Sequence, residues 1–320
     1  MRVLASLPSS KCARIISIVV LTGFVSASLF AQTDLVQAVR SQIAQGSFSA
    51  ADSDLQRYKA SQGVTPEYLE ALSWMARGAA ASGNWTQATT YATDTRKLSE
   101  QQLQKRKLDA EPHLPMALGA AYEVLAQALE AKGEHSQAAS LLRSALARYG
   151  NTSIKSRLQK NLNLIALVGQ PAPALQEAQF LGPKPPTLAS VKGMPVLLFF
   201  WAHWCVDCKG EAPIIARLKQ EFSPDGLVVI GPTKLYGYAA QGNDASPEQE
   251  RAYIESVRQR YYSSLQDMPV PLSQQNFNAY GASTTPTLVV LNREGKVAMY
   301  HPGALSYEDL RAAVQKAVAR

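Results

Sequence analysis

The spacing of apolar residues divides the chain into two parts with different patterns. Between about residues 33 and 167, apolar side chains recur with the period of a helix, and strand-like alternation is almost absent. Further along, short apolar runs alternate with helical stretches, as in a sheet covered by helices. Val196–Phe200 and Leu227–Ile230 have the composition of buried strands, while Thr287–Leu291 and Val297–Tyr300 predict a hairpin. We therefore expect an all-α region followed by an α/β domain.

A short motif recurs three times in the helical part. Three glycines are each followed five residues later by an alanine, in the pairs Gly46 and Ala51, Gly83 and Ala88, and Gly133 and Ala138. Glycine supplies the left-handed turn that ends one helix, and a small alanine lets the next helix approach closely. The motif resembles tetratricopeptide-like hairpins and predicts three of them, with a closing helix near Ile154–Leu167. The intervals between the glycines are unequal, so an unrelated helical bundle is the alternative.

A proline-rich stretch at Gln170–Pro173 separates the two parts. Beyond it, apolar stripes predict helices near Cys208–Phe222 and Pro247–Leu265. Ser306 is expected to cap a last helix, with Asp309 completing an S-x-x-D box. The predicted segments are a leader (residues 1–31), a tetratricopeptide-like helical domain (32–167) and an α/β domain (168–320).

The first 31 residues have the pattern of a secretory signal. Three basic residues precede the apolar run Ile15–Leu21, and small residues follow it. Cleavage after Ala27 or Ala31 is expected. The alternative is an uncleaved membrane anchor, although the apolar stretch Ile15–Phe30 is shorter than the ~20 residues of a spanning helix. The pattern predicts an exported, periplasmic protein.

Charge and cysteine content narrow the function classes. The formal net charge is +7, and the dense basic run Lys105–Lys107 has no interleaved aromatic residues, which favours a solvated helix face over a nucleic-acid site. The chain has three cysteines, and Cys12 lies in the leader. Cys205 and Cys208 are thus the cysteines of the mature chain, and a disulfide closing so short a loop adds little stability. Redox chemistry is the better explanation for the pair.

The surroundings of this pair point to thiol–disulfide exchange. The C-x-x-C motif follows the buried strand and opens a helix, whose N–H groups favour the thiolate of Cys205. That thiolate can attack a substrate disulfide, and Cys208 can then resolve the mixed disulfide. Electrons pass through thiols, so no diffusible cofactor is expected.

Several landmarks resemble the thioredoxin superfamily. These are Trp-Ala-x-Trp-Cys-x-x-Cys with Pro213 in the following helix, Thr285-Pro286-Thr287 before a strand, and, as in the TlpA/ResA-like branch, Glu211-x-Pro213. The resemblance covers about residues 168–320 and implies an α/β thioredoxin fold, a mixed sheet flanked by helices. It also implies a redox-active disulfide between Cys205 and Cys208, and a cis-proline, Pro286, that faces it. Trp204, Thr285 and Pro286 are the implied substrate-binding residues.

Three positions depart from the family pattern. Phe199 stands where thioredoxin has a buried acid, and Glu211 is the implied proton-accepting substitute; its alternative role is to favour the helix dipole. Asp207 lies between the cysteines. His203 either lowers the pKa of Cys205 or is a solvated loop histidine. The two carboxylates should raise the pKa of Cys205, which predicts a reductant.

Two other function classes compete with this interpretation. A copper chaperone of thioredoxin fold would use the cysteines with His301 as a third ligand, although such proteins resemble C-x-x-x-C. A protein-binding module would keep only a secondary redox role. The expected partners are substrate proteins with disulfides, a thiol electron donor, soluble or membrane-bound, and a protein that docks on the helical domain.

Overall fold

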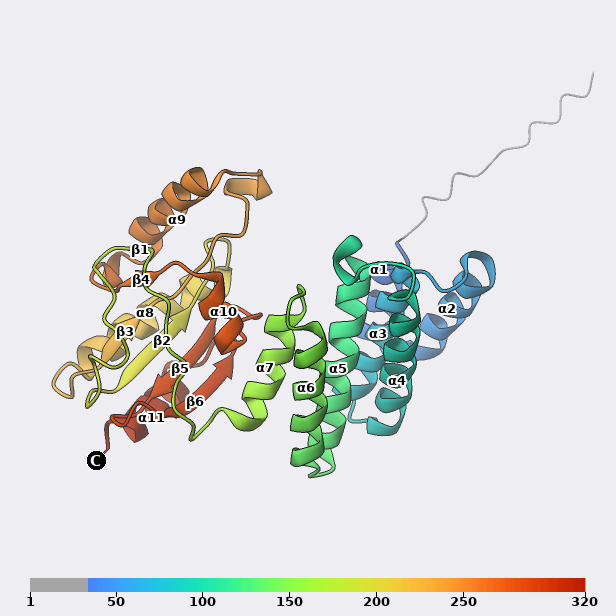
Figure 1. Cartoon of the computed structure of the whole chain (residues 1–320), viewed down its shortest axis with the longest axis horizontal. Coiled ribbons are helices and arrows are strands. Elements are labelled where there is room, and N and C mark those ends of the chain that lie inside the picture. The colour runs from blue at the N-terminus through green and yellow to red at the C-terminus, as the bar shows by residue number, and fades with distance from the viewer. Residues whose placement is uncertain (1–33, 320) are drawn as a thin grey trace, which may run out of the picture. The chain divides into compact units, whose positions relative to one another are not determined.

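A computed structural model describes residues 34–319 (Figure 1). The first part is built from helices that follow one another with short connections. They are α1 (Leu35–Ala44), α2 (Phe48–Gln62), α3 (Pro66–Ala81), α4 (Trp85–Gln102), the 3₁₀ helix η1 (Leu108–Ala110), α5 (His113–Ala131), α6 (His135–Tyr149) and α7 (Lys155–Ala166). The predicted leader and its cleavage sites lie outside the described residues. Between residues 34 and 319, no helix is long and apolar enough to cross a membrane.

The glycine and alanine positions explain the helical hairpins. Gly46, Gly83 and Gly133 end α1, α3 and α5 and have positive φ angles of 74°, 75° and 76°. The three alanines of the motif, Ala51, Ala88 and Ala138, are fully buried in the helices that follow. Each predicted turn is therefore present. The assignment to tetratricopeptide-like repeats stays a prediction.

The second part contains a four-stranded mixed sheet. Its elements are β1 (Phe180–Leu181), β2 (Val196–Phe200), α8 (Val206–Glu221), β3 (Val228–Ile230), η2 (Ala240–Gly242), α9 (Pro247–Tyr261), η3 (Ser263–Leu265), β4 (Val270–Pro271), α10 (Gln274–Tyr280), β5 (Thr287–Leu291), β6 (Val297–Pro302) and α11 (Tyr307–Val318). The order is β3-β2-β5-β6, with β2 parallel to β3 and antiparallel to β5. This confirms the expected thioredoxin-type fold class.

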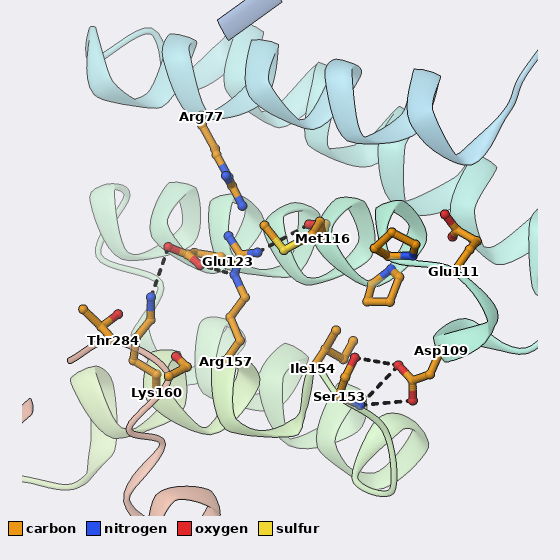
Figure 2. A pocket seen from close by; sticks show the side chains of 13 residues that line it. Arg77, Asp109, Glu111, Met116, Glu123, Ser153, Ile154, Arg157, Lys160 and Thr284 are labelled. Atoms are coloured by element: carbon orange, nitrogen blue, oxygen red, sulfur yellow. Dashed lines mark hydrogen bonds and ion pairs between the residues drawn. The ribbon is translucent and has the colours of Figure 1, made fainter. Parts of the chain in front are cut away.

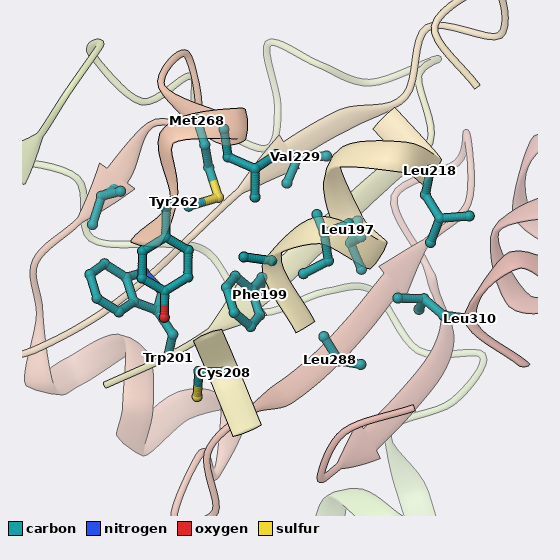
Figure 3. Close-up of a cluster of buried hydrophobic side chains, with 14 of the residues drawn as sticks. Leu197, Phe199, Trp201, Cys208, Leu218, Val229, Tyr262, Met268, Leu288 and Leu310 are labelled. Atoms are coloured by element: carbon teal, nitrogen blue, oxygen red, sulfur yellow. The ribbon is translucent and has the colours of Figure 1, made fainter. Parts of the chain in front are cut away.

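The two faces of the sheet carry separate hydrophobic clusters. Leu197, Phe199 and Leu288 point to the face covered by α8, α9 and α11, and Figure 3 shows them packed with Trp201 and Tyr262. The alternate residues of the same strands join α10 in a second cluster on the opposite face. Because successive side chains of a strand point to opposite faces, a continuously apolar β2 fills both clusters.

Helix α7 packs on both parts of the chain. Its residues Leu158, Leu162 and Ile165 lie in or against the core of the helical part. On the other side, the Ser156 hydroxyl donates to Asn278 Oδ1 of α10 at 2.7 Å, and Leu167 joins the sheet cluster. The predicted closing helix thus contacts both the helical part and the α/β part of the chain.

The structure differs from the sequence predictions in several elements. The short strands β1 and β4 pair with each other, and helix α10 follows them; none of the three has a long apolar pattern. The predicted helix to Leu265 ends at Tyr261 and continues as η3. Lys105–Lys107 is exposed as expected, but it lies in the connection after α4 rather than on a helix face. Ser306 does cap α11, because its hydroxyl oxygen accepts a hydrogen bond from the Asp309 N–H. In a capping box the Asp309 carboxylate would accept from the Ser306 backbone N–H, but here it accepts from the Ser306 hydroxyl instead.

Candidate active site

The first turn of α8 holds the two cysteines. Cys205 is the N-cap residue, and Cys208 is the third residue of the helix. They form a disulfide with their Cα atoms 5.3 Å apart, and the Cys205 Sγ accepts a hydrogen bond from the Cys208 backbone N–H at 3.0 Å. A thiolate at this position would receive the same donor together with the positive end of the helix dipole. The helix start therefore favours Cys205 over Cys208 as the attacking group.

A cavity of about 720 Å³ is lined by Trp204, the residue that directly precedes Cys205, and thus lies next to the cysteine-containing loop. Trp204, which is 47% exposed, and Thr285 both line it, so the structure brings these two predicted substrate-binding residues together. Pro286 follows Thr285 in a cis peptide bond, as the resemblance implied, and is buried. The cavity is also lined by residues 150–153 and 155–156, which connect α6 to α7 and begin α7. The helical part thus contributes a wall beside the redox centre.

Glu211 occupies a buried position in α8. It is the sixth residue of the helix, so the alternative role as a first-turn partner of the helix dipole does not apply. Its Oε2 accepts a long bond of 3.4 Å from the Leu305 N–H, and its Oε1 has no hydrogen-bond partner. Burial raises the pKa of Glu211 to about 7, with a smaller contribution from the Asp207 charge. The carboxyl can therefore gain or lose a proton near neutral pH.

His203 is buried, and its interpretation as a solvated loop histidine is wrong. Its side chain is 1% exposed, and its Nε2 lies 3.3 Å from the Glu250 carboxylate. Tyr236, Tyr238 and Tyr253 surround the imidazole edge-on at 5.3–5.5 Å between ring centroids. Burial lowers the pKa of His203, and the Glu250 charge opposes this shift. A neutral His203 does not supply positive charge to the Cys205 thiolate.

Glu250 and Lys234 were not predicted from the sequence. Glu250 is 1% exposed and accepts backbone N–H bonds from Tyr236 at 2.6 Å and Gly237 at 2.8 Å. It comes from the polar helix α9, where a charged residue is ordinary, so no sequence signal marks it. Lys234 lines the cavity beside Trp204, and its amine lies 4.7 Å from the Tyr236 ring centroid. Tertiary packing alone shows that both belong to the site.

Two histidines of the helical part have acidic neighbours. His113 Nδ1 lies 2.8 Å from Glu70, and His135 Nδ1 lies 3.0 Å from Glu130. His301, the candidate copper ligand, is part of β6. Throughout residues 34–319, no three His, Cys, Asp or Glu side chains are grouped to hold a metal ion. The ligand set that the copper alternative requires is not assembled there.

The fold and this site define the class of protein. A C-x-x-C disulfide at a helix start and a cis-proline loop on a mixed sheet are those of a thioredoxin-fold domain, and residues 167–316 match the Redoxin family. The C-terminal half is thus a Redoxin domain, and the protein is an oxidoreductase of the thiol–disulfide type.

Similar proteins include the thioredoxin-like protein YneN of Bacillus subtilis, 27% identical over 44% of this chain and 75% of its own. The thiol-disulfide oxidoreductase ResA of Geobacillus thermodenitrificans is 23% identical over 39% of this chain and 63% of its own. The chain spans less than two thirds of ResA. Among solved structures, a thioredoxin family thiol:disulfide interchange protein from Chlorobium tepidum aligns over 47% of this chain and 97% of its own, with 22% identity and a TM-score of 0.36.

Proposed function

We propose that this protein is an exported, periplasmic reductant of protein disulfides that works through the Cys205 and Cys208 dithiol. The observation that carries the proposal is the placement of Cys205 at the N-cap of α8, with its Sγ bonded to the Cys208 N–H. The cavity lined by Trp204 and Thr285 offers room for a substrate segment next to it. The leader sequence supports export.

The reaction consists of two thiol–disulfide exchanges. The Cys205 thiolate attacks one sulfur of the substrate disulfide, forms a mixed disulfide and releases the first substrate thiolate. Cys208 then loses its proton and attacks the Cys205 sulfur, which restores the Cys205–Cys208 disulfide and releases the second substrate thiolate. Two electrons have passed to the substrate. A thiol donor, soluble or membrane-bound, returns two electrons to the protein.

Glu211 is suited to accept the proton of Cys208. It lies three residues further along α8, on the same side of the helix, and its pKa of about 7 lets it be a base at neutral pH. Trp204, Thr285 and Pro286 would hold the substrate chain beside Cys205. In the helical part we propose a docking site for a protein partner, since stacked helical hairpins present extended binding surfaces.

Trapping of the mixed disulfide tests the proposal. A Cys208→Ser variant should accumulate adducts with substrate proteins through Cys205, because no thiol remains to resolve them. The Cys205→Ser variant is the matched control and should accumulate few. Adducts are counted on non-reducing gels of exported fractions and identified by mass spectrometry. Equal yields from both variants would show that Cys205 is not the attacking residue.

A further inference from the structure

A second cavity, of about 920 Å³, lies between α5, α7 and the loop that precedes the cis-proline. Ser283 and Thr284 of that loop form part of its lining. Asp109, Ser153 and Ser283 line this cavity and also the one beside the cysteines, so the two cavities adjoin. A substrate segment that leaves the redox centre along the loop can therefore reach the second cavity.

The charges in this cavity are separated into two ends (Figure 2). At one end, Arg77, Arg157 and Lys160 surround Glu123. At the other, Asp109 and Glu111 are engaged by N–H groups, since Asp109 accepts from Ser153 and Glu111 accepts from the first residues of α5. The carboxylates at the acidic end thus already accept hydrogen bonds from backbone N–H groups. The basic end has three cations and one carboxylate.

The single carboxylate of the basic end is already shared. Glu123 Oε2 accepts from Arg157 Nε at 2.6 Å, and Glu123 Oε1 lies 3.4 Å from Lys160 Nζ. Arg77 forms no ion pair or hydrogen bond with any side chain of residues 34–319, and its guanidinium stacks 4.3 Å from the Trp74 ring centroid. Figure 2 shows it reaching toward Glu123 and Arg157. At this end of the lining one carboxylate therefore faces three cations, and Glu70, outside the lining, adds a further attraction to Arg77.

Burial makes this excess charge costly. The side chains of Arg157 and Lys160 are only 17% and 13% exposed. Burial, followed by the Arg157 charge, lowers the pKa of Arg77 to about 10. Desolvated cations gain much more from an anionic partner than exposed ones do. Apolar side chains complete the lining, namely Pro112, Pro115, Met116 and Ile154.

We propose that the basic end of this cavity binds an Asp or Glu side chain of the protein substrate while the substrate disulfide is engaged at Cys205. The inference rests on the proposed function and adds its substrate class, namely disulfides flanked by an acidic residue. A substrate carboxylate would add negative charge beside Arg77, where cations outnumber carboxylates, and the neighbouring aliphatic part of the peptide would cover the apolar wall. Continuity with the redox cavity favours a peptide over a free anion.

Paired peptide disulfides test the proposal on the full mature chain. One series carries Glu at successive positions two to six residues from the cysteine, and the matched series carries Gln. The ratio of kcat/KM for reduction of Glu and Gln peptides should be about ten at the best position, the effect of one charge-assisted contact. It should fall toward one in the Arg77→Gln protein. Arg40→Gln is the matched control, because Arg40 stacks on the same Trp74 ring at 4.4 Å but does not line the cavity.

Two further measurements separate the remaining outcomes. In the wild-type protein the ratio should decrease as ionic strength rises, which needs no variant that might unfold. Calorimetric titration of a protein with both cysteines replaced by serine measures peptide binding without any redox step, with glutarate as the free-anion probe. Failure to reduce either peptide would refute the proposed function alone. Equal binding of Glu and Gln peptides, an unchanged ratio in Arg77→Gln, or glutarate binding as tight as the peptide would each overturn the acidic-peptide site.

Discussion

At the residue scale, the charges around Cys205 determine how the dithiol behaves. The buried His203 has a lowered pKa and is neutral at pH 7, so the helix start is the source of positive potential at the sulfur. Asp207 lies in the first turn and is exposed, and Glu211 lies one turn further and is buried. Negative charge near a thiol raises the pKa of that thiol. These charges favour a reducing role for the dithiol over an oxidising one.

We expect the Cys205 pKa to be about 7 or higher, in the range of a thioredoxin-like thiol rather than of an extreme oxidant. Replacing Asp207 by Asn removes one negative charge and should lower this pKa. The change should also make the disulfide more oxidising. Thiolate absorbance against pH and equilibration with glutathione measure both quantities. A Cys205 pKa below about 5 in the unmodified protein is incompatible with a reductant role.

Glu211→Gln should slow disulfide reduction by about a hundredfold at pH 8, the lower end of what a positioned acid–base group contributes. The rate of the unmodified protein should rise as the pH passes through about 7, because Glu211 and the Cys205 thiol both ionise in this range, and the variant should keep only the rise that belongs to Cys205. Stopped-flow rates between pH 5 and pH 9 measure the difference. If variant and parent have the same profile after each rate is divided by its measured Cys205 thiolate fraction, the proton transfer belongs to another group.

The same carboxyl makes a second, independent contribution to folding stability. Because the pKa of Glu211 is raised from 4.5 to about 7, the folded protein binds more protons than the unfolded chain between these values. Stability from this group is therefore full below pH 4.5 and is lost as the pH rises to 7. In Glu211→Gln this loss is absent, so denaturant midpoints of variant and parent should diverge with rising pH.

At the scale of elements, the contact between α7 and α10 depends on one glycine. Gly281 ends α10 with a φ of 60°, and a Cβ atom there would lie 2.3 Å from the Lys160 backbone nitrogen. Backbone atoms within a helix cannot move aside as a side chain can. The close approach of these two helices therefore requires glycine.

Gly281→Ala should destabilise the protein by about 3 kcal/mol or more, combining a left-handed φ with overpacking against a backbone. Gly133→Ala is the control, since Gly133 has a φ of 76° and nothing within 4 Å of the added Cβ. It should lose only about 1 kcal/mol, the cost of the φ angle alone. Urea unfolding gives both values. Equal losses would mean that α7 and α10 are not in close contact.

At the scale of the whole described chain, α7 couples the helical part to the redox part. One side of it packs in the helical core, and the other side meets α10 and the sheet cluster. The residues at the start of α7 also line the cavity beside the cysteines. Helix α7 thus contributes both to the stability of the protein and to the cavity in which we propose that the substrate binds.

Residues 34–167 alone should fold, because their core is their own, but α7 loses its contact with α10. We expect helical circular dichroism at low temperature and a Tm about 5 °C or more below that of the helices in the full chain. Hydrogen exchange should localise the loss to α7. An equal Tm, with α7 equally protected, would show that α7 draws no stability from the redox part.

The sequence was sufficient for features that depend on local physics. The apolar run of β2, the left-handed glycine turns and the C-x-x-C at a helix start each have their cause within a few residues. The thioredoxin-type fold class and the disulfide pair were implied by the resemblance to the thioredoxin superfamily that these motifs carry. Short elements such as β1, β4 and α10 did not, because their stability comes from partners far along the chain.

Tertiary structure determined the environment of the reactive groups. Folding buries Glu211, which raises its pKa to about 7 although the Leu305 N–H bond opposes the shift. Folding also buries His203 among Tyr236, Tyr238 and Tyr253, which lowers the pKa of His203 although the Glu250 charge opposes the shift. Arg77, Arg157 and Lys160 come from helices far apart in sequence and converge in a single cavity. Burial and long-range electrostatics depend on the packed structure, whereas turns, caps and periodicity are properties of the chain itself.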